Sequence, residues 1–232
     1  MYPSIETSVQ KIFDADWNIT RGIVVPKSED VVMENGGRLL DATYLYADLA
    51  GSSKLAHSVD KVITATIIRA YINTASRILK ELDGSIRSFD GDRVMAVFMG
   101  EGKNDMAVRA AFAINWAVSK VIEPAINAKW PEVSRVYNID HGIGIDTGEA
   151  LIVRGGVRID NDLISIGDAP NDAARLSDYR RYSINITKAV HDDLHDLHRS
   201  YGDLKFWNSS MGCEALGFHT VTYHSNVEWG LQ

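Results

Sequence analysis

The feature that most constrains this chain is a single carboxylate at the end of an apolar run. Residues 39–47 are rich in aromatic and aliphatic side chains and predict a β-strand, and Asp48 follows them directly. The next residues, including Gly51, Ser52 and Ser53, are small and open a segment with helical spacing. Because the first backbone N–H groups of a helix have no partner within it, this arrangement favours the binding of phosphate oxygens.

A second aspartate, Asp92, stands in a predicted hairpin. Residues 85–89 and 94–98 are short strand-like runs around Asp-Gly-Asp, and Asp-Gly suits tight hairpin turns. Residues 59–82 have helical spacing, and a helix between two strands can bring those strands side by side. We therefore expect Asp48 and Asp92 at neighbouring strand ends, where two carboxylates beside a helix start suit a Mg²⁺–triphosphate site.

Each of these signals also has a structural interpretation. A lone aspartate before a helix commonly caps that helix, and an Asp-Gly-Asp sequence is commonly only a turn. The order of strand, helix and hairpin agrees with the spacing of the two carboxylates along the chain. This agreement favours a metal–phosphate site over two unrelated turns.

Strand-like and helical segments alternate along the chain, with hairpins inserted, and this order predicts an α+β fold with a mixed sheet. Residues 146–149, Asp-Thr-Gly-Glu, are predicted to join two of the strands. The chain has 232 residues, of which 45% are hydrophobic, so it can bury one sizeable core. We expect a helical arm and loop over residues 1–38, a single domain over 39–226 and a tail over 227–232.

The first residues have the pattern of an amphipathic helix. Their apolar side chains recur at helical spacing, which fits a helix packed on its own domain or one that contacts a second copy of the chain. These side chains are Ile5, Val9, Ile12, Phe13 and Trp17.

Charge and composition exclude several classes of protein. The net charge of −7 argues against a protein that coats nucleic acid. The single cysteine, Cys213, cannot form an intramolecular disulfide, which suits a reducing cytoplasm. The N-terminus lacks the pattern of a signal peptide, and no apolar run approaches the ~20 residues that span a bilayer. We expect a soluble cytoplasmic protein with neither a nucleic-acid nor a membrane partner.

Four motifs resemble the catalytic domain of the class III nucleotidyl cyclases. YLYADLAGSSKL is similar to the first metal motif of that family, and FDGDRVMAVF to the second. HGIGIDTGEALIVRGG and ISIGDAPNDAARLSD resemble its strand–turn–strand and its Asn/Arg motif. The resemblance covers residues 40 to 223. It implies a catalytic domain with a ferredoxin-like βαββαβ core, a mixed or antiparallel sheet and extra C-terminal strands.

The resemblance implies a role for individual residues. Asp48 and Asp92 would be ligands of two divalent metal ions, Mn²⁺ or Mg²⁺, together with the backbone of Leu49. The small residues that open the next helix would bind the substrate phosphates. These residues are Gly51, Ser52 and Ser53.

The same resemblance implies that Asn171 orients the ribose and its 3′-hydroxyl, and that Arg175 stabilises charge on the α-phosphate. The two residues lie at i and i+4 of a predicted helix and so share a face. The alternative for Arg175 is a surface salt bridge with Asp172 or Asp178. In this family the aspartates come from one catalytic domain and the Asn/Arg pair from another, so one such domain implies a homodimer that binds a nucleoside triphosphate.

The positions that select the base depart from the purine cyclases. Where adenylate cyclases have Lys and Asp or Thr, this chain has Ser88, beside Arg87, and Ile164. Tyr46 points to the same side of its strand as Asp48, where it would either narrow the base pocket or belong to the core. An unmatched buried base edge costs ~1–3 kcal/mol per group, so these four residues indicate a different base.

The combination resembles the bacterial pyrimidine cyclases of the Pycsar anti-phage systems, whose cyclic nucleotide is sensed by a separate effector protein. This resemblance favours UTP as the substrate and cyclic UMP as the product, with CTP next. An adenylate cyclase with an unusual base pocket and a non-catalytic nucleotide-binding domain remain the alternatives. The late phosphate-binding Lys of the family has no counterpart in SSMGCEALGFHTVTY, and the spacing does not choose among Lys205, Arg181 and Arg154.

Overall fold

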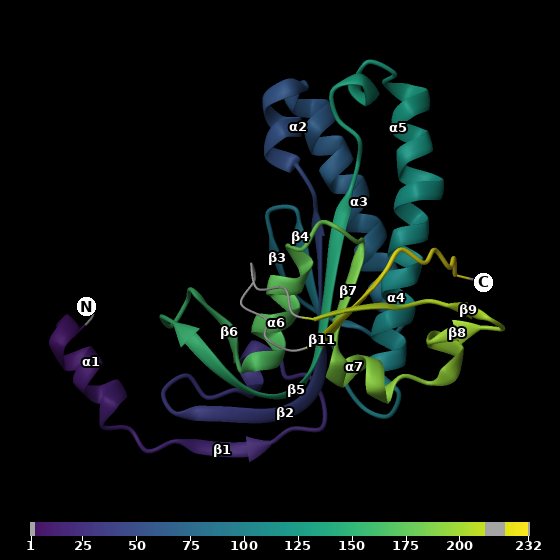
Figure 1. The fold of residues 1–232 in the computed structure, drawn as a ribbon. Helices are drawn as coiled ribbons and strands as arrows, with labels where there is room; N and C mark the ends of the chain where they lie inside the picture. Colours follow the sequence, from purple (N-terminus) through teal and green to yellow (C-terminus); the bar gives the residue numbers. More distant parts are fainter. Residues whose placement is uncertain (1–2, 212–220, 232) are drawn as a thin grey trace.

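The long apolar run becomes the central strand of one large sheet (Figure 1). This computed structural model describes residues 3–211 and 221–231. The central strand, β2 (Gly36–Leu49), is buried on both faces. Leu45 and Ala47 pack under the helices, whereas Tyr44 belongs to a second apolar cluster on the other face. Since side chains alternate along a strand, Tyr46 and Asp48 point to the same face as Tyr44.

The sheet confirms the predicted ferredoxin-like core. Its strand order is β10-β11-β7-β5-β2-β4-β3, with β1 added to β2 and β6 added to β5. The βαββαβ unit is β2, α3, β3, β4, α4 and β5, and its four strands form the antiparallel segment β5-β2-β4-β3. β6, β7, β10 and β11 are the expected C-terminal additions, whereas β1 precedes the core. The bounds are β3 Ser85–Asp90, β4 Arg93–Phe98, β5 His141–Gly156, β6 Asn161–Ile166, β7 Ile184–Thr187, β10 Asn208–Met211 and β11 Val221–Ser225, and β8 (Ser200–Tyr201) pairs with β9 (Leu204–Lys205) apart from this sheet.

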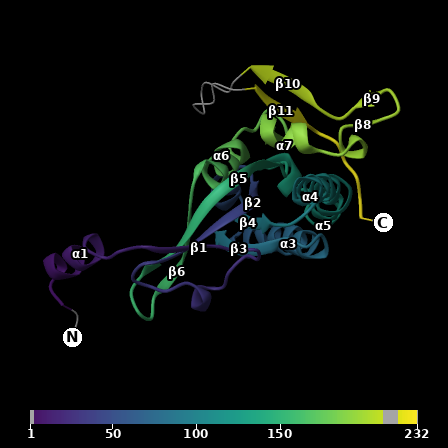
Figure 2. The ribbon, with the colours of Figure 1, turned by 90° about the horizontal axis from the view of Figure 1, so that it is seen from below.

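Two long helices cover one face of the sheet, and a shorter one packs on the other (Figures 1 and 2). α3 (Lys61–Glu81) begins where the Asp60 side chain accepts the backbone N–H groups of Val62 and Ile63. α4 (Lys103–Ala117) continues through a π-helical turn into α5 (Glu123–Lys129). α6 is on the opposite face. The other helices are α1 Ile5–Phe13, α2 Ser52–Ser58, α6 Asp168–Ser177 and α7 Lys188–Asp193, with 3₁₀ turns at Ser28–Asp30, Val133–Arg135 and Asp196–His198. None of the described helices is long and apolar enough to cross a bilayer.

The prediction of a turn at residues 146–149 is wrong. β5 is one continuous strand, and its pairing with β2 runs without interruption from Gly37 opposite Val153 to Leu49 opposite His141. Asp-Thr-Gly-Glu has the composition of a turn, but the paired backbone of β2 holds these residues extended, because tertiary pairing outweighs local propensity. The far end of this ribbon, with β6, projects away from the helices (Figure 2).

The N-terminal segment contains a strand that the sequence did not predict. β1 (Asn18–Arg21) pairs in parallel with the start of β2, although every one of its residues is exposed. A short strand without apolar alternation leaves no periodic signal. The expected helix is present as α1, which buries none of its residues and lies apart from the main body (Figure 1).

Two glycines let α6 lie directly on β5. A Cβ atom at Gly144 would be 2.0 Å from the carbonyl oxygen of Ala173, and one at Gly142 would be 2.2 Å from that of Ser177. Both contacts are with backbone atoms of α6, which cannot rotate away as a flexible side chain could. The close approach of α6 to the sheet therefore depends on the absence of side chains at these positions.

We predict that Gly144→Ala lowers the free energy of unfolding by about 3 kcal/mol, the upper part of the usual range for overpacking, because α6 must shift to admit the methyl group. Urea unfolding measures this loss. Gly148→Ala is the control in the same strand, since its Cβ would lie 3.6 Å from the nearest atom, an ordinary contact. Equal stability of the two variants would show that α6 does not pack on β5 as described.

Candidate active site

The two sequence-predicted aspartates lie at adjacent strand ends. Asp48, near the end of β2, is paired in register with Arg93, the first residue of β4. Asp92 precedes Arg93 in the two-residue hairpin turn, and its carbonyl oxygen accepts the N–H of Leu49 at 3.4 Å. The crossover through α3 thus brings the two carboxylate-bearing residues together, as the order of the elements predicted.

Two arginines hold the Asp48 carboxylate. Arg93 Nη2 donates to Oδ2 of Asp48 at 3.1 Å and to Oδ1 of Asp178 at 2.6 Å. Arg180 donates twice, from Nη2 to the same Oδ2 at 2.5 Å and from Nη1 to the backbone oxygen of Asp48 at 3.0 Å. Asp48 is only 8% exposed, so these charge-assisted bonds offset the cost of burying its carboxylate. The sequence did not single out either arginine.

The chain turns sharply after Asp48 to start α2. Gly51 adopts a left-handed conformation, with φ of 68°, and precedes Ser52, the first residue of the helix. The hydroxyl of Tyr137 donates to the carbonyl oxygen of Ala50 at 2.9 Å and fixes the turn. Gly51 and Ser53 are exposed and Ser52 is half-buried, so the predicted phosphate-binding residues are at the surface beside Asp48.

Within the described ranges, no group of three or more His, Cys, Asp or Glu residues could hold a metal ion. The site offers a pair of carboxylates, Asp48 and Asp92. Mg²⁺ typically takes one or two protein carboxylates and completes its shell with water and substrate phosphates. The donor set therefore fits a metal that arrives with a nucleotide rather than one that the protein holds alone.

The second predicted pair lies on α6, on the face turned away from the sheet. Ala173 and Leu176 are buried against the sheet, whereas Asn171 is exposed and Arg175 half-buried. Arg175 donates to Asp172 at 2.8 Å, the local ion pair that was the structural alternative. No hydrogen bond or ion pair reported for the described residues joins Asn171 to Asp48 or Asp92.

The spacing along α6 explains this separation. Asp178, just beyond the helix, bonds to Arg93 at the metal-ligand pair. Asn171 lies seven residues earlier, about 10 Å along the axis at 1.5 Å per residue. The structure thus brings Asp48 and Asp92 together and leaves Asn171 and Arg175 facing outward from the same chain.

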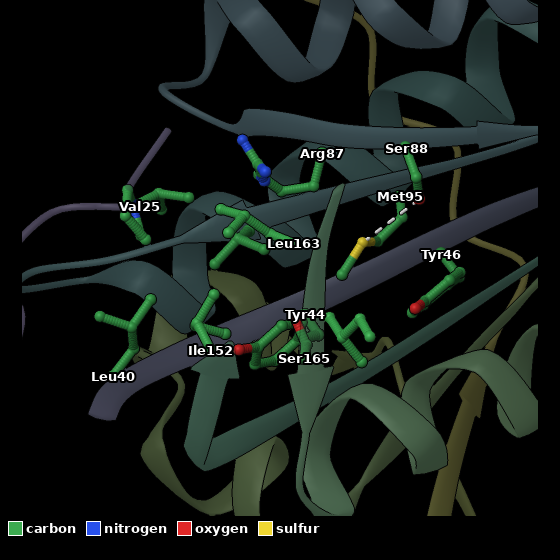
Figure 3. Close-up of a pocket in the computed structure, with 13 residues that line it drawn as sticks. Val25, Leu40, Tyr44, Tyr46, Arg87, Ser88, Met95, Ile152, Leu163 and Ser165 are labelled. Carbon is green, nitrogen blue, oxygen red and sulfur yellow. Dashed lines mark hydrogen bonds between the residues drawn. The ribbon is translucent and has the colours of Figure 1, made fainter. Parts of the chain in front are cut away.

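The four predicted base-selecting residues line one cavity of about 240 Å³ (Figure 3). Tyr46 comes from β2, Arg87 and Ser88 from β3, and Ile164 from β6. The cavity is on the face of the sheet to which Asp48 points. It is somewhat smaller than the ~300–1,000 Å³ of sites for drug-sized ligands, which suits a single small ring. Val25 and Pro26, in the segment predicted to be arm and loop, also line it.

An irregularity in β3 puts two consecutive side chains into this cavity. The register of β3 against β4 shifts between Ile86 and Ser88, so Arg87 is an extra residue that no β4 residue opposes. In a regular strand Arg87 and Ser88 would point to opposite faces, but a bulge can direct both to one side. Ser88 Oγ donates to Met95 Sδ at 3.5 Å (Figure 3). Nη2 of Arg87 lies 4.0 Å from Oδ1 of Asp162.

Two further polar side chains line the cavity and were missed from the sequence. They are Tyr44 and Ser165. Tyr44 is fully buried, and burial raises its pKa to about 12, an effect that an interaction with the neighbouring Ser165 hydroxyl opposes. Burial also raises the pKa of Tyr46, an effect that the charge of Arg93 opposes. Tyr44 lies in a run of apolar and aromatic residues, a pattern that indicates a core side chain and not a polar role.

Known proteins resemble the chain in sequence and in fold. It is 44% identical over 198 residues to a uridylate cyclase of Rhodovulum sp. (strain MB263), covering 84% of this chain and 82% of the relative. A uridylate cyclase of Xanthomonas perforans is 33% identical, covering 97% and 96%. The crystal structure of the adenylyl cyclase CyaB from P. aeruginosa superposes with a TM-score of 0.67 at 19% identity, covering 82% and 95%. No protein-family model matches the chain.

The chain belongs to the uridylate cyclase family. It is a nucleotidyl cyclase with the class III fold, and the predicted fold class is confirmed. The carboxylate pair of Asp48 and Asp92 and the cavity lined by Tyr46 and Arg87 are the candidate active-site features of this cyclase. The roles of individual residues in binding and catalysis remain predictions.

Among the described residues, no hydrogen bond or ion pair joins Asp48 to Arg154, Arg181 or Lys205, the candidates for the late phosphate-binding residue. Arg154 Nε donates to Asn161 at 2.7 Å on the projecting ribbon, and the guanidinium of Arg181 lies 5.7 Å from the centre of the Tyr182 ring. Lys205 lines a separate hollow beside β11. Residues 212–220, which include Cys213 and most of the segment aligned with the family Lys, lie outside the described residues.

A buried carboxyl on β5 lies beside α6. Asp146 accepts the Thr187 hydroxyl at 2.5 Å and the Thr147 N–H at 2.8 Å. Burial raises its pKa from 3.8 to about 6; the two hydrogen bonds oppose this rise, and the charges of Asp172 and Asp168 add to it. The folded protein therefore holds this proton more tightly than the unfolded chain does.

The stability that this proton contributes is fully present below about pH 4 and is lost as the pH rises through about 6. We predict that Asp146→Asn, which keeps an acceptor oxygen but cannot ionise, abolishes this loss. Between pH 4 and pH 7 the stability difference between variant and unsubstituted protein should move by roughly 3 kcal/mol in favour of the variant.

Urea unfolding at several pH values measures this difference. Asp203 is exposed, so Asp203→Asn is the control without burial. Its free energy of unfolding should depend on pH in the same way as that of the unsubstituted protein. If the curve of Asp146→Asn is also parallel, the buried carboxyl is not linked to folding in this pH range.

Proposed function

We propose that the chain converts UTP to 3′,5′-cyclic UMP and pyrophosphate. The observation that carries this proposal is the single cavity that gathers Tyr46, Arg87, Ser88 and Ile164 on the sheet face to which Asp48 points. The two uridylate cyclases compared above add support, since they match most of the chain. An adenylate or cytidylate cyclase and a non-catalytic nucleotide-binding domain are the competing outcomes.

The reaction is the attack of the ribose 3′-oxygen on the α-phosphorus, with the bond to pyrophosphate breaking. Asp48 and Asp92, with the backbone of Leu49, would hold two divalent ions, Mn²⁺ or Mg²⁺. When bound, such ions lower the pKa of the hydroxyl and neutralise the phosphates. Asn171 would orient the ribose, and Arg175 would stabilise the charge that develops on the α-phosphate. The backbone at Gly51, Ser52 and Ser53 would face the remaining phosphates.

Two copies of the chain would build each site. Asn171 and Arg175 lie on the face of α6 turned away from the sheet, and Asn171 is about 10 Å along the helix axis from Asp178, which bonds to Arg93. A second copy related by two-fold symmetry would present its Asn171 and Arg175 to Asp48 and Asp92 of the first. We therefore propose a homodimer with two equivalent sites.

The polar groups in the cavity favour uracil over cytosine. Arg87 can only donate hydrogen bonds, and the hydroxyls of Tyr46 and Ser88 can donate as well. Uracil offers a carbonyl oxygen at position 4, where cytosine carries an amino group that is itself a donor. A guanidinium facing that position would be matched by uracil and left unpaired by cytosine.

We propose that the cyclic UMP formed in the cytoplasm is an anti-phage second messenger, sensed by a separate effector protein, by analogy with the Pycsar cyclases. This proposal rests on the resemblance of the base-selecting residues. In such a system this chain would be the enzyme that makes the messenger.

We predict that purified protein with Mn²⁺ or Mg²⁺ converts UTP, and little ATP, GTP or CTP, to a cyclic nucleotide identified by mass spectrometry. Asp48→Asn is the control for contaminating activity and should lose at least about 100-fold in rate, because a metal ligand is removed. Cyclic CMP or cyclic AMP as the main product would overturn the base assignment. No product from any of the four would favour the non-catalytic alternative.

The shared site predicts complementation. Asp48→Asn and Arg175→Ala should each be inactive alone, because each removes one half of both sites. When equal amounts are mixed, half of the dimers contain one intact site, and activity should return to about a quarter of the unsubstituted level. A mixture that stays inactive, while size-exclusion chromatography shows subunit exchange, would place all four residues in one chain's site.

A further inference from the structure

The carboxylate proposed to bind the metal is already neutralised by the chain itself. Oδ2 of Asp48 accepts hydrogen bonds from both Arg93 and Arg180. A divalent ion at Asp48 would come within a few ångströms of both guanidinium groups. Like charges a few ångströms apart repel each other strongly, and a divalent ion doubles the effect, so at least one arginine must give way when the ion binds.

Arg180 is the arginine that is free to leave. Arg93 has a second anionic partner, Asp178, at 2.6 Å, and keeps it if Asp48 is taken. Arg180 is 3.9 Å from Asp178, and its other bond is to the Asp48 backbone. When a metal ion takes Asp48, Arg93 therefore stays bonded to Asp178. Arg180 loses its closest anionic partner and can turn to another anion.

The path of Arg180 depends on a glycine. Arg180 lies three residues beyond α6, and its guanidinium passes over β5 to reach β2. At Gly142, which is paired with Asp48 in the sheet, a Cβ atom would be 2.4 Å from Nη1 of Arg180. Because this notch in β5 has no side chain, the guanidinium can lie at the strand end where the substrate phosphates would arrive.

We propose that Arg180 binds the triphosphate: it neutralises Asp48 in the metal-free protein and transfers to the phosphates when the metal–nucleotide complex enters. This inference rests on the proposed function and deepens it, since it names the cation that replaces the late Lys of the family. Phosphates that bind a metal ion at Asp48 would lie close to that carboxylate. They would therefore be within reach of the Arg180 guanidinium, which bonds to Asp48 in the metal-free protein. A guanidinium also matches phosphate oxygens in a bidentate way.

Two effects of opposite sign test this proposal. In Arg180→Gln, Mn²⁺ alone should bind the protein about 3–10 times more tightly, because a competing cation is gone. 3′-Deoxy-UTP has no 3′-hydroxyl and cannot cyclise. Its Kd in the presence of Mn²⁺ should rise about 10–100-fold, because a charge-assisted bond to phosphate is lost. Electron paramagnetic resonance of free Mn²⁺ measures the first effect and isothermal titration calorimetry the second.

Two further variants keep the test decisive. Arg180→Lys keeps the charge without the bidentate geometry, so both effects should persist in the same directions at smaller size, even if Arg180→Gln does not fold. Arg77→Gln removes an arginine from an exposed pair with Glu81 on α3 and should change neither affinity. Mn²⁺ affinity that is unchanged or lower, or 3′-deoxy-UTP binding within twofold of the unsubstituted protein, overturns the proposal.

The outcome is separable from that of the proposed function. Pyrophosphate with Mn²⁺, which carries no base, should show the same loss of affinity in Arg180→Gln. A preference for CTP or ATP over UTP would overturn the base assignment but leave the pyrophosphate result standing. Conversely, cyclic UMP formation with an unchanged pyrophosphate affinity would keep the function and remove Arg180 from the triphosphate site.

Discussion

The uninterrupted antiparallel pairing of β2 with β5 is the constraint on which the rest of the structure depends. One end of this ribbon carries Asp48 and the glycine over which Arg180 passes. Gly144, two residues further along β5, supports α6, and the far end of the ribbon, with β6, forms part of the cavity wall. Because thirteen successive residue pairs fix the register, a slip of one residue would turn Tyr46 and Asp48 into the core together.

The sequence predicted the features that depend on local patterns. The apolar run before Asp48, the helix after it and the hairpin at Asp92 each have a short-range signal, and their order alone brings the two carboxylates together. The predicted turn at residues 146–149 failed because pairing with β2 outweighs turn composition. The roles of Arg180 and Tyr44 could not be predicted, because they arise from contacts between residues far apart in the chain.

Charge at the strand end is balanced within the chain. Asp48 and Asp178 bond to Arg93 and Arg180, so the buried Asp48 carboxylate has two cationic partners in a protein whose net charge is −7. A buried carboxylate without these partners would carry a large desolvation cost. The site can therefore fold before any ion is present, and binding becomes an exchange of partners rather than the first neutralisation of Asp48.

The extra residue at Arg87 has a consequence beyond the cavity. β3 ends the strand order of the sheet, so within residues 3–211 and 221–231 one side of its backbone has no neighbouring strand. A straight, exposed edge can add a strand from another molecule and start aggregation, and a bulge makes that edge a poor template. The irregularity that turns Arg87 and Ser88 inward thus also protects this edge of the sheet from pairing with a strand of another molecule.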